Sequence, residues 1–169
     1  MYVPVGKAKY WPTIESVGRS LPLLIENQLW ELEEAGRCYA AGRNTACIFH
    51  LMRGTEHGLR MLARRLRVKL TNKKQFMPIE FGDLNTIITA VRNKICAARK
   101  LALGPKRQAQ LERYSTIADR CEDMKEIWRN NLAHARKPYN EQQALDALGK
   151  VLSFMQTVGI ALDKRSSSL

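Results

Sequence analysis

Apolar residues recur along this chain at the spacing of an α-helix, and polar or Gly/Pro-containing breaks separate five such stretches. No stretch shows the apolar/polar alternation that is typical of a half-buried β-strand. Short connections between successive helices favour antiparallel neighbours. We therefore predict an all-α fold, an antiparallel up-and-down bundle of about five helices. The expected helices cover residues 23–41, 45–68, 83–101, 105–128 and 140–162.

The stretch 45–68 has the clearest two-sided pattern. At 100° per residue its apolar residues share one broad face, and its basic residues and histidines share the opposite face. Thr45 stands at the start of this stretch and is expected to cap the helix. Glu56 lies at the edge of the apolar arc. The apolar face holds Ile48, Phe49, Leu51, Met52, Leu59, Leu62, Ala63 and Leu66, and the opposite face holds His50, Arg53, His57, Arg60 and Arg64.

Turn and capping residues mark the boundaries between the stretches. Gly42-Arg43-Asn44 is expected to break or bend the path, and Asp83 to open the third helix. Gly104-Pro105 is a stop-and-start signal. Asn140, three residues before Gln143, predicts a reciprocal capping box for the last helix.

The length suits one domain. We predict that residues 21–164 form a single helical-bundle domain, that residues 1–20 form an irregular arm docked through its aromatic side chains, and that residues 165–169 form a disordered tail. No apolar run approaches the roughly 20 residues that a membrane helix needs. No signal peptide is evident, so we expect a cytoplasmic protein with no membrane partner.

The chain is strongly basic, with a formal net charge of +12. Such a charge favours polyanionic partners, because binding releases condensed counterions. A solvated basic surface without a partner is the alternative. The segment 69–78 is predicted to be a connection between helices. The densest basic run leads into it and consists of Arg64, Arg65, Arg67, Lys69, Lys73 and Lys74.

The four cysteines lie apart, without Cys-x-x-Cys spacing, and each stands among apolar or small residues. A zinc site would need paired ligands at short spacing. We therefore expect reduced, buried thiols, and neither a metal nor another cofactor. The residues concerned are Cys38, Cys47, Cys96 and Cys121.

The most informative segment is Arg129-Asn130-Asn131-Leu132-Ala133-His134, which follows an apolar helix that reaches Trp128. Cleavage of RNA by its own 2′-hydroxyl needs a base, an acid and a group that stabilises charge on the phosphorane. We assign the base or acid role to His134, charge stabilisation to Arg129 and positioning to Asn130.

On one unbroken helix, Arg129 and His134 would point about 140° apart. They converge only if the helix ends near Asn130-Asn131, or if a second subunit supplies the partner residue. The spacing itself carries little weight, because about one such match arises by chance among 16 Arg and 3 His. Arg43 and His50 form such a match, with His50 in the middle of a predicted helix.

The surroundings of this segment carry more information. Trp128-Arg129-Asn130 and His134 are followed by Pro138-Tyr139-Asn140, and then by a helix that contains Phe154-Met155. Upstream, residues 40–53 read AAGRNTACIFHLMR. Together these features resemble the HEPN superfamily, and the upstream run looks like the second-helix signature of an uncharacterised bacterial branch of HEPN-like proteins. The resemblance extends from Pro22 to Leu162.

The resemblance implies a helical bundle that is usually a homodimer, in which the Arg129–His134 motifs of two subunits line one cleft and cut RNA without a metal. Many HEPN proteins are instead inactive binding modules. In HEPN toxins restrained by a nucleotidyltransferase-type antitoxin partner, a Tyr that this partner modifies often follows the His by two residues. Arg136 holds that position here and the nearest Tyr is Tyr139, which puts this regulation in doubt.

Other residues are candidates for supporting roles. Glu56 is a candidate brace for Arg129, with a solvated boundary residue as the alternative. Tyr139 is either a stacking platform for a base or the hydrophobic residue before a helix cap, the reading that we favour. The predicted RNA-binding residues are Arg136, Lys137, Tyr139, Lys125 and Arg53.

We therefore predict a metal-independent HEPN-type endoribonuclease that acts as a toxin or in phage defence. The alternative is a catalytically inactive HEPN-like module that binds RNA, a nucleotide or a protein partner. A third interpretation is a structural helical dimer whose Asn and Arg residues cap helices.

Overall fold

The computed structural model describes residues 5–10, 26–72, 75–100 and 138–162, and within 104–124 it describes residues 104, 105, 108, 111, 112, 114–117, 119, 120, 123 and 124. Of the described residues, 82% are helical, which confirms the all-α fold class. The long helices are α2 (Glu26–Ala40), α3 (Asn44–Arg65), α4 (Leu84–Lys100) and α6 (Glu141–Leu162), and short 3-10 helices are η1 (Val5–Tyr10) and η2 (Ile79–Phe81).

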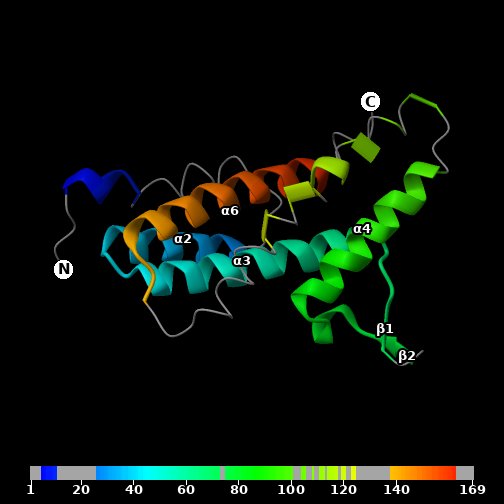
Figure 1. The fold of residues 1–169 in the computed structure, drawn as a ribbon, viewed down its shortest axis with the longest axis horizontal. Helices are drawn as coiled ribbons and strands as arrows, with labels where there is room; N and C mark the ends of the chain where they lie inside the picture. Colours follow the sequence, from blue (N-terminus) through cyan, green and yellow to red (C-terminus); the bar gives the residue numbers. More distant parts are fainter. Residues whose placement is uncertain are drawn as a thin grey trace.

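Helix α3 is the centre of the bundle (Figure 1). It runs antiparallel to α2, and α6 lies along the same pair of helices. Its C-terminal half reaches α4, which crosses the far end of the molecule at an angle. None of the described helices is long and apolar enough to cross a bilayer.

Most of the predicted inner face of α3 is buried. Ile48, Leu51, Leu59, Leu62 and Ala63 have at most 3% of their surface exposed. Phe49 is 55% exposed, so its expected place in the core is wrong. Phe49 precedes Leu51 by two residues and so points about 160° away from it around the helix.

The turn between α2 and α3 forms where the sequence predicts a break. Gly42 adopts a left-handed φ of 73°, which glycine tolerates without a steric penalty. The N–H groups of Gly42 and Arg43 donate to the carbonyl oxygens of Tyr39 (3.0 Å) and Cys38 (2.8 Å). The predicted cap at Thr45 is wrong. Helix α3 begins at Asn44, its N-cap residue Arg43 makes no side-chain capping bond, and the Thr45 hydroxyl instead accepts a hydrogen bond from Tyr139.

The other two predicted caps are confirmed. Asp83 Oδ1 accepts the Thr86 N–H at 2.9 Å and so caps α4. At the start of α6, Asn140 Oδ1 accepts the Gln143 N–H at 2.9 Å while Gln143 Oε1 accepts the Asn140 N–H at 3.0 Å. This reciprocal pair satisfies two amides that a helix end otherwise leaves without partners.

The inner faces of the later helices follow their predicted spacing. In α4, Ile87, Val91 and Ile95 are buried, and Leu84 and Ala98 are partly buried. The described residues of the fourth predicted helix are helical, whereas Cys121 and Trp128 of its stripe lie outside the described residues. Buried residues are Leu111, Tyr114, Ile117 and Met124 in that segment, and Leu148, Val151, Met155 and Val158 in α6.

The segment 69–78 contains a β-hairpin, so the prediction that the chain has no strand is wrong. Strands β1 (Leu70–Asn72) and β2 (Gln75–Met77) pair antiparallel, with Leu70 opposite Met77. Each strand has three residues, which is too short for alternation to stand out from chance. Leu70 is 2% exposed, and this burial attaches the hairpin to the core beside α4.

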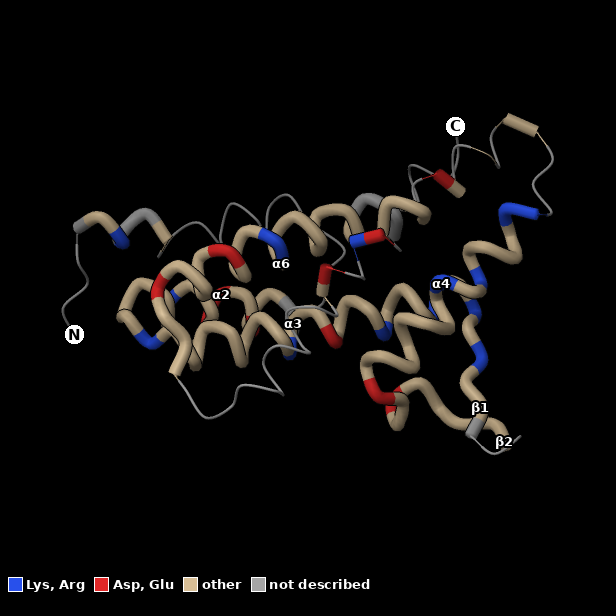
Figure 2. The backbone as a smooth tube through the Cα atoms, in the orientation of Figure 1, with Lys and Arg blue, Asp and Glu red and all other residues tan. Residues whose placement is uncertain are grey.

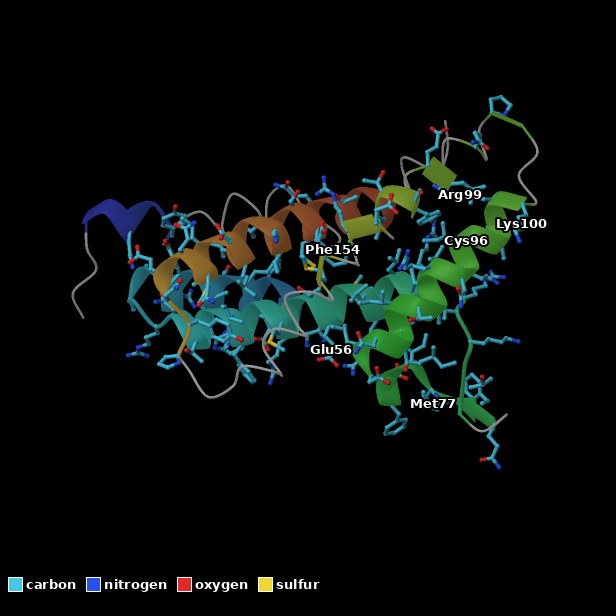
Figure 3. The ribbon with its side chains drawn as sticks, in the orientation of Figure 1. Glu56, Met77, Cys96, Arg99, Lys100 and Phe154 are labelled. Atoms are coloured by element: carbon cyan, nitrogen blue, oxygen red, sulfur yellow. The ribbon has the colours of Figure 1, made fainter. Side chains whose placement is uncertain are left out.

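The cysteines follow the prediction in part. Cys38 and Cys47 are buried free thiols, whereas Cys96 lies exposed on α4 and corrects the expectation that it is buried (Figure 3). Cys121 lies outside the described residues. Burial raises the pKa of the Cys47 thiol to about 12, and Cys38 nearby adds to this effect.

The 3-10 helix η1 lies on the surface of α2. Tyr10 meets Tyr39 edge to face, with ring centroids 4.8 Å apart. Lys7 Nζ lies 5.0 Å from the centre of the same ring and 2.9 Å from Glu141 Oε2. These aromatic and cationic contacts hold the described part of the N-terminal arm against α2 and the start of α6.

Helix α6 packs tightly against α3 at Gly58. A Cβ atom built there lies 2.8 Å from Met155 Sδ and 3.1 Å from Met155 Cε. Met155 is fully buried, so the end of its side chain has to shift within the packed core to admit a methyl group. We expect Gly58→Ala to destabilise the fold by about 1–3 kcal/mol through overpacking, against the usual gain in helix propensity. Chemical denaturation measures the free energy of unfolding.

Gly149→Ala is the matched control, because a Cβ atom at this exposed position of α6 meets nothing within 4 Å. Helix propensity alone should stabilise that variant by up to about 1 kcal/mol. Equal effects of the two substitutions would contradict the close approach at Gly58.

The Asp83 cap gives a prediction for pH. Hydrogen bonds from the Thr86 hydroxyl and N–H lower the pKa of the Asp83 carboxyl. Because this pKa is lower in the folded state, the cap stabilises the protein above the unfolded-state pKa, and its contribution is lost as the pH falls through the folded-state value. Asp83→Ala should cost about 1 kcal/mol at neutral pH, and progressively less in acid.

Asp83→Asn is the control, because an amide oxygen also caps a helix and does not titrate. Its advantage over Asp83→Ala should persist in acid. Denaturation curves at neutral and acidic pH compare the three proteins, and a wild type no more stable than Asp83→Ala at neutral pH would rule out the cap.

Candidate functional site

Most of the predicted catalytic and RNA-binding residues lie outside the described part of the chain. Arg129, Asn130 and His134 lie outside the described residues, as do the predicted RNA-binding residues Lys125, Arg136 and Lys137. The description resumes at Pro138. The described part of the predicted site therefore consists of Tyr139, Arg53 and Glu56.

Tyr139 anchors the start of α6 to the start of α3. Its N–H donates to Thr45 Oγ1 at 3.2 Å, across 94 residues of sequence. The side chain is partly buried and packs against the hydrophobic core, and this desolvation raises the pKa of its hydroxyl. These contacts agree with the interpretation of Tyr139 as the hydrophobic residue before the Asn140 cap. A hollow of about 370 Å³ lies at this junction, lined by Gly42, Arg43, Asn44, Thr45, Ala46, Pro138 and Tyr139.

Glu56 has a partner among the described residues. Its carboxylate accepts a hydrogen bond from Arg60 at 2.6 Å, an i,i+4 pair on α3. Figure 3 shows Glu56 on the side of α3 that faces away from Phe154 and α6. Arg60 also donates to the Glu80 carbonyl at 3.2 Å, so this pair links α3 to η2.

Arg53 belongs to a cluster around a buried carboxylate that the sequence interpretation did not identify. Glu31 on α2 is 2% exposed. Arg53 Nε donates to Glu31 Oε1 at 2.5 Å, and His50 Nδ1 lies 2.8 Å from Glu31 Oε2. A carboxylate at this depth is costly unless both oxygens have partners. The two residues of α3 supply one partner to each oxygen.

Exposed aromatic rings flank this cluster. Trp30 is 51% exposed and Phe49 is 55% exposed. Both rings meet His50 edge to face, with centroid distances of 5.7 Å for Trp30 and 5.8 Å for Phe49. The Arg53 guanidinium carbon lies 5.9 Å from the centre of the Phe49 ring. We call Trp30, Phe49, His50 and Arg53 the aromatic–cationic surface.

The antiparallel hairpin of α2 and α3 explains why these side chains meet (Figure 1). Glu31 and Arg53 lie at equal sequence distances before and after Gly42, so an antiparallel pair of helices places them side by side. His50 and Arg53 are three residues apart and share one face of α3. This equal spacing is the one sequence signal that could have identified the cluster.

Three metal-ligating groups also lie close together beside the Glu31 cluster. Glu34 and Cys38 lie one turn apart on α2, beside His50 on α3, and one ligand atom from each lies within 4.8 Å of the other two. Cys38 Sγ and Glu34 Oε1 are 4.0 Å apart. Burial, followed by the nearby charge of Glu34, raises the pKa of the Cys38 thiol.

A second basic region lies at the other end of the molecule. A groove of about 850 Å³ lies between β1 and α4. Its described lining includes Arg67, Lys69 and Lys94 and contains no Asp or Glu. Figure 2 shows the basic positions along α4 and on the chain that enters β1. Arg67 has a left-handed φ of 53°. This groove holds two members of the dense basic run, whereas Arg64 of the same run forms an ion pair with Glu80.

Comparison with known proteins gives no relative: no family model, no curated protein and no solved structure matches this chain. The resemblance to HEPN proteins therefore stays a prediction that depends on the residues quoted for it.

The Glu31 cluster gives a stability prediction with an internal control. Arg53 and Arg64 are both on α3, both side chains are 52% exposed, and each pairs with one glutamate. Glu31 is 2% exposed, whereas Glu80 is 53% exposed. Arg53→Ala should lower the free energy of unfolding by about 2 kcal/mol, because it leaves one buried carboxylate oxygen without its charged partner.

Arg64→Ala should change the stability little, since exposed ion pairs are screened by water. Denaturant titration of both variants under the same conditions measures the difference. Equal losses of stability would show that the burial of Glu31 does not decide the strength of the Arg53 contact.

Proposed function

We propose that this protein is a HEPN-type RNA-binding protein that cleaves single-stranded RNA without a metal ion. In the proposed reaction the 2′-hydroxyl loses its proton, and its oxygen attacks the adjacent phosphorus. The bond to the 5′-oxygen breaks as that oxygen gains a proton, which leaves a 2′,3′-cyclic phosphate and a 5′-hydroxyl. His134 takes up or delivers a proton as general base or acid, Arg129 stabilises the phosphorane charge, and Asn130 positions the RNA or the His134 ring. Two chains contribute their motifs to one cleft.

The aromatic–cationic surface is the observation that supports RNA binding, which the proposed cleavage requires. Proteins that bind single-stranded RNA combine aromatic rings, on which bases stack, with cations that contact the phosphates. Trp30 and Phe49 offer two rings that are about half exposed, and Arg53 lies beside the Phe49 ring. Both rings lie against His50, and each keeps about half of its surface open to a base.

The Tyr139 anchor supports a location for the proposed catalytic motif near this surface. Thr45, which binds Tyr139, precedes Phe49 by one helical turn, or about 6 Å along α3. His134 precedes Pro138 by four residues, and four residues of extended chain span at most about 14 Å. The chain therefore allows His134 to reach RNA bound at Phe49.

The alternative function is RNA binding without cleavage. Within the described part of the chain, each member of the aromatic–cationic surface lies on α2 or α3 and contacts residues of these two helices. Binding at this surface is therefore expected without Arg129 or His134. The two functions differ in one outcome, which is whether bound RNA is cut.

The test combines cleavage with binding. Purified protein should cleave labelled single-stranded RNA in the presence of EDTA, and His134→Ala or Arg129→Ala should slow cleavage by at least about 100-fold. Trp30→Ala or Phe49→Ala should weaken RNA binding about tenfold through lost stacking. Arg99→Ala on α4 and Phe81→Ala, where the side chain is 78% exposed on η2, are the matched controls and should behave as the wild type (Figure 3).

Cleavage by His134→Ala at the wild-type rate would rule out the proposed chemistry. RNA that binds through Trp30 and Phe49 but stays intact would support the binding module. Binding that is unaffected by both aromatic substitutions would remove the aromatic–cationic surface from either function.

A further inference from the structure

We propose that Glu34, Cys38 and His50 form a binding site for a zinc ion between α2 and α3. This site goes beyond the proposed ribonuclease activity, which needs no metal. Its role in the proposal is structural: the metal fixes α2 against α3 beneath the aromatic–cationic surface.

The ligand set matches the preferences of zinc. A thiolate, an imidazole nitrogen and a carboxylate oxygen are the three types of protein ligand that this ion takes. One ligand atom from each residue lies within 4.8 Å of the other two, so small side-chain movements can bring all three to one ion. A soft thiolate and an imidazole favour zinc over magnesium or calcium, which prefer oxygen ligands.

The helical framework places these ligands without strain. Glu34 and Cys38 are four residues apart on α2 and so share one face of that helix. His50 comes from the facing side of α3. Two ligands from one helix and one from its neighbour make the ion a cross-link between two elements that already pack together.

Glu31 supplies the support that a metal-binding histidine usually has. Zinc-bound histidines commonly donate their second ring N–H to a carboxylate, which fixes the ring and its tautomer. Here the Glu31 carboxylate lies 2.8 Å from His50 Nδ1, so the other ring nitrogen, Nε2, is assigned to the ion. Glu31 is held in turn by Arg53 and is buried, so this orientation is well defined.

The sequence did not reveal this site because only one of its ligands is a cysteine. Cys-x-x-Cys spacing, the pattern that usually reveals zinc, is absent. Glu34 and Cys38 are the two ligands that share a helix, and residues of these types often occur four positions apart by chance. The third ligand comes from another helix and becomes visible only when α2 and α3 pack together.

Cobalt(II) is the probe for the test, because a thiolate ligand gives it a charge-transfer absorption band that zinc lacks. Full-length protein freed of metal by EDTA and dialysis is titrated with Co²⁺, and Zn²⁺ is then added to displace it. We expect one ion per chain, a thiolate-to-cobalt band, and a higher melting temperature with Zn²⁺.

Cys38→Ser should abolish the thiolate band, and His50→Gln should weaken Zn²⁺ binding by at least about tenfold. Cys96→Ser is the matched control, since this exposed thiol on α4 is the one most open to adventitious metal. Glu34→Gln keeps the thiolate and covers the case in which Cys38→Ser does not fold. It should retain the band and bind Zn²⁺ at least about tenfold more weakly.

A thiolate band that survives in Cys38→Ser, or disappears in Cys96→Ser, would overturn the proposal. Unchanged Zn²⁺ affinity in both His50→Gln and Glu34→Gln would do the same. RNA cleavage in EDTA has no bearing on these outcomes, so the zinc site and the ribonuclease proposal can fail separately.

Discussion

The buried carboxylate of Glu31 is the constraint on which the α2–α3 hairpin depends. Its depth requires a partner at each oxygen, and the structure provides both from His50 and Arg53, which lie about one turn apart on α3. A shift of α2 by one turn along α3 would separate Glu31 from Arg53 and His50. Hydrophobic contacts tolerate such a slide better than a buried charge does, because they have no fixed direction. Glu31 therefore sets the register of the hairpin.

This register has consequences beyond the hairpin. It holds His50 between Trp30 and Phe49, and it places the same ring beside Glu34 and Cys38. It also sets the position of the α2–α3 turn, where Thr45 receives Tyr139 and so locates the start of α6. Helix α6 then packs on α3 closely enough that a Cβ atom at position 58 would displace the end of the Met155 side chain.

The sequence predicts the parts of this fold that depend on local interactions. The caps at Asp83 and Asn140 lie within four residues of their partners, and the inner faces of α4 and α6 follow one helical period. The predictions are wrong where contacts between residues far apart in the sequence determine the structure, or where the local pattern is misleading or too short. Thr45 has a capping residue's chemistry but binds a residue 94 positions away. Phe49 is apolar yet exposed, and three-residue strands are too short to show their period.

The sequence likewise predicts only part of the candidate site. Residue types and their order predict Arg53 as a functional residue, but its buried partner Glu31 stands among other acidic residues on α2 and has no distinguishing local pattern. Only tertiary packing separates Glu31, at 2% exposure, from Glu33 and Glu34, whose side chains are 35% and 30% exposed. The relative placement of Arg129 and His134 depends on how one chain or two chains bring them together, which helical periodicity does not determine.

His50 belongs both to the proposed RNA-binding surface and to the proposed zinc site. RNA would contact the exposed rings of Trp30 and Phe49, whereas zinc would bind the inner edge of His50 toward the buried Cys38. A metal in that position carries no catalytic duty. It would reduce the motion of α2 against α3, so the rings would lose less conformational entropy when a base stacks on them. The expected coupling between zinc and RNA is therefore positive and appears in affinity, while the rate of the chemical step stays independent of the metal.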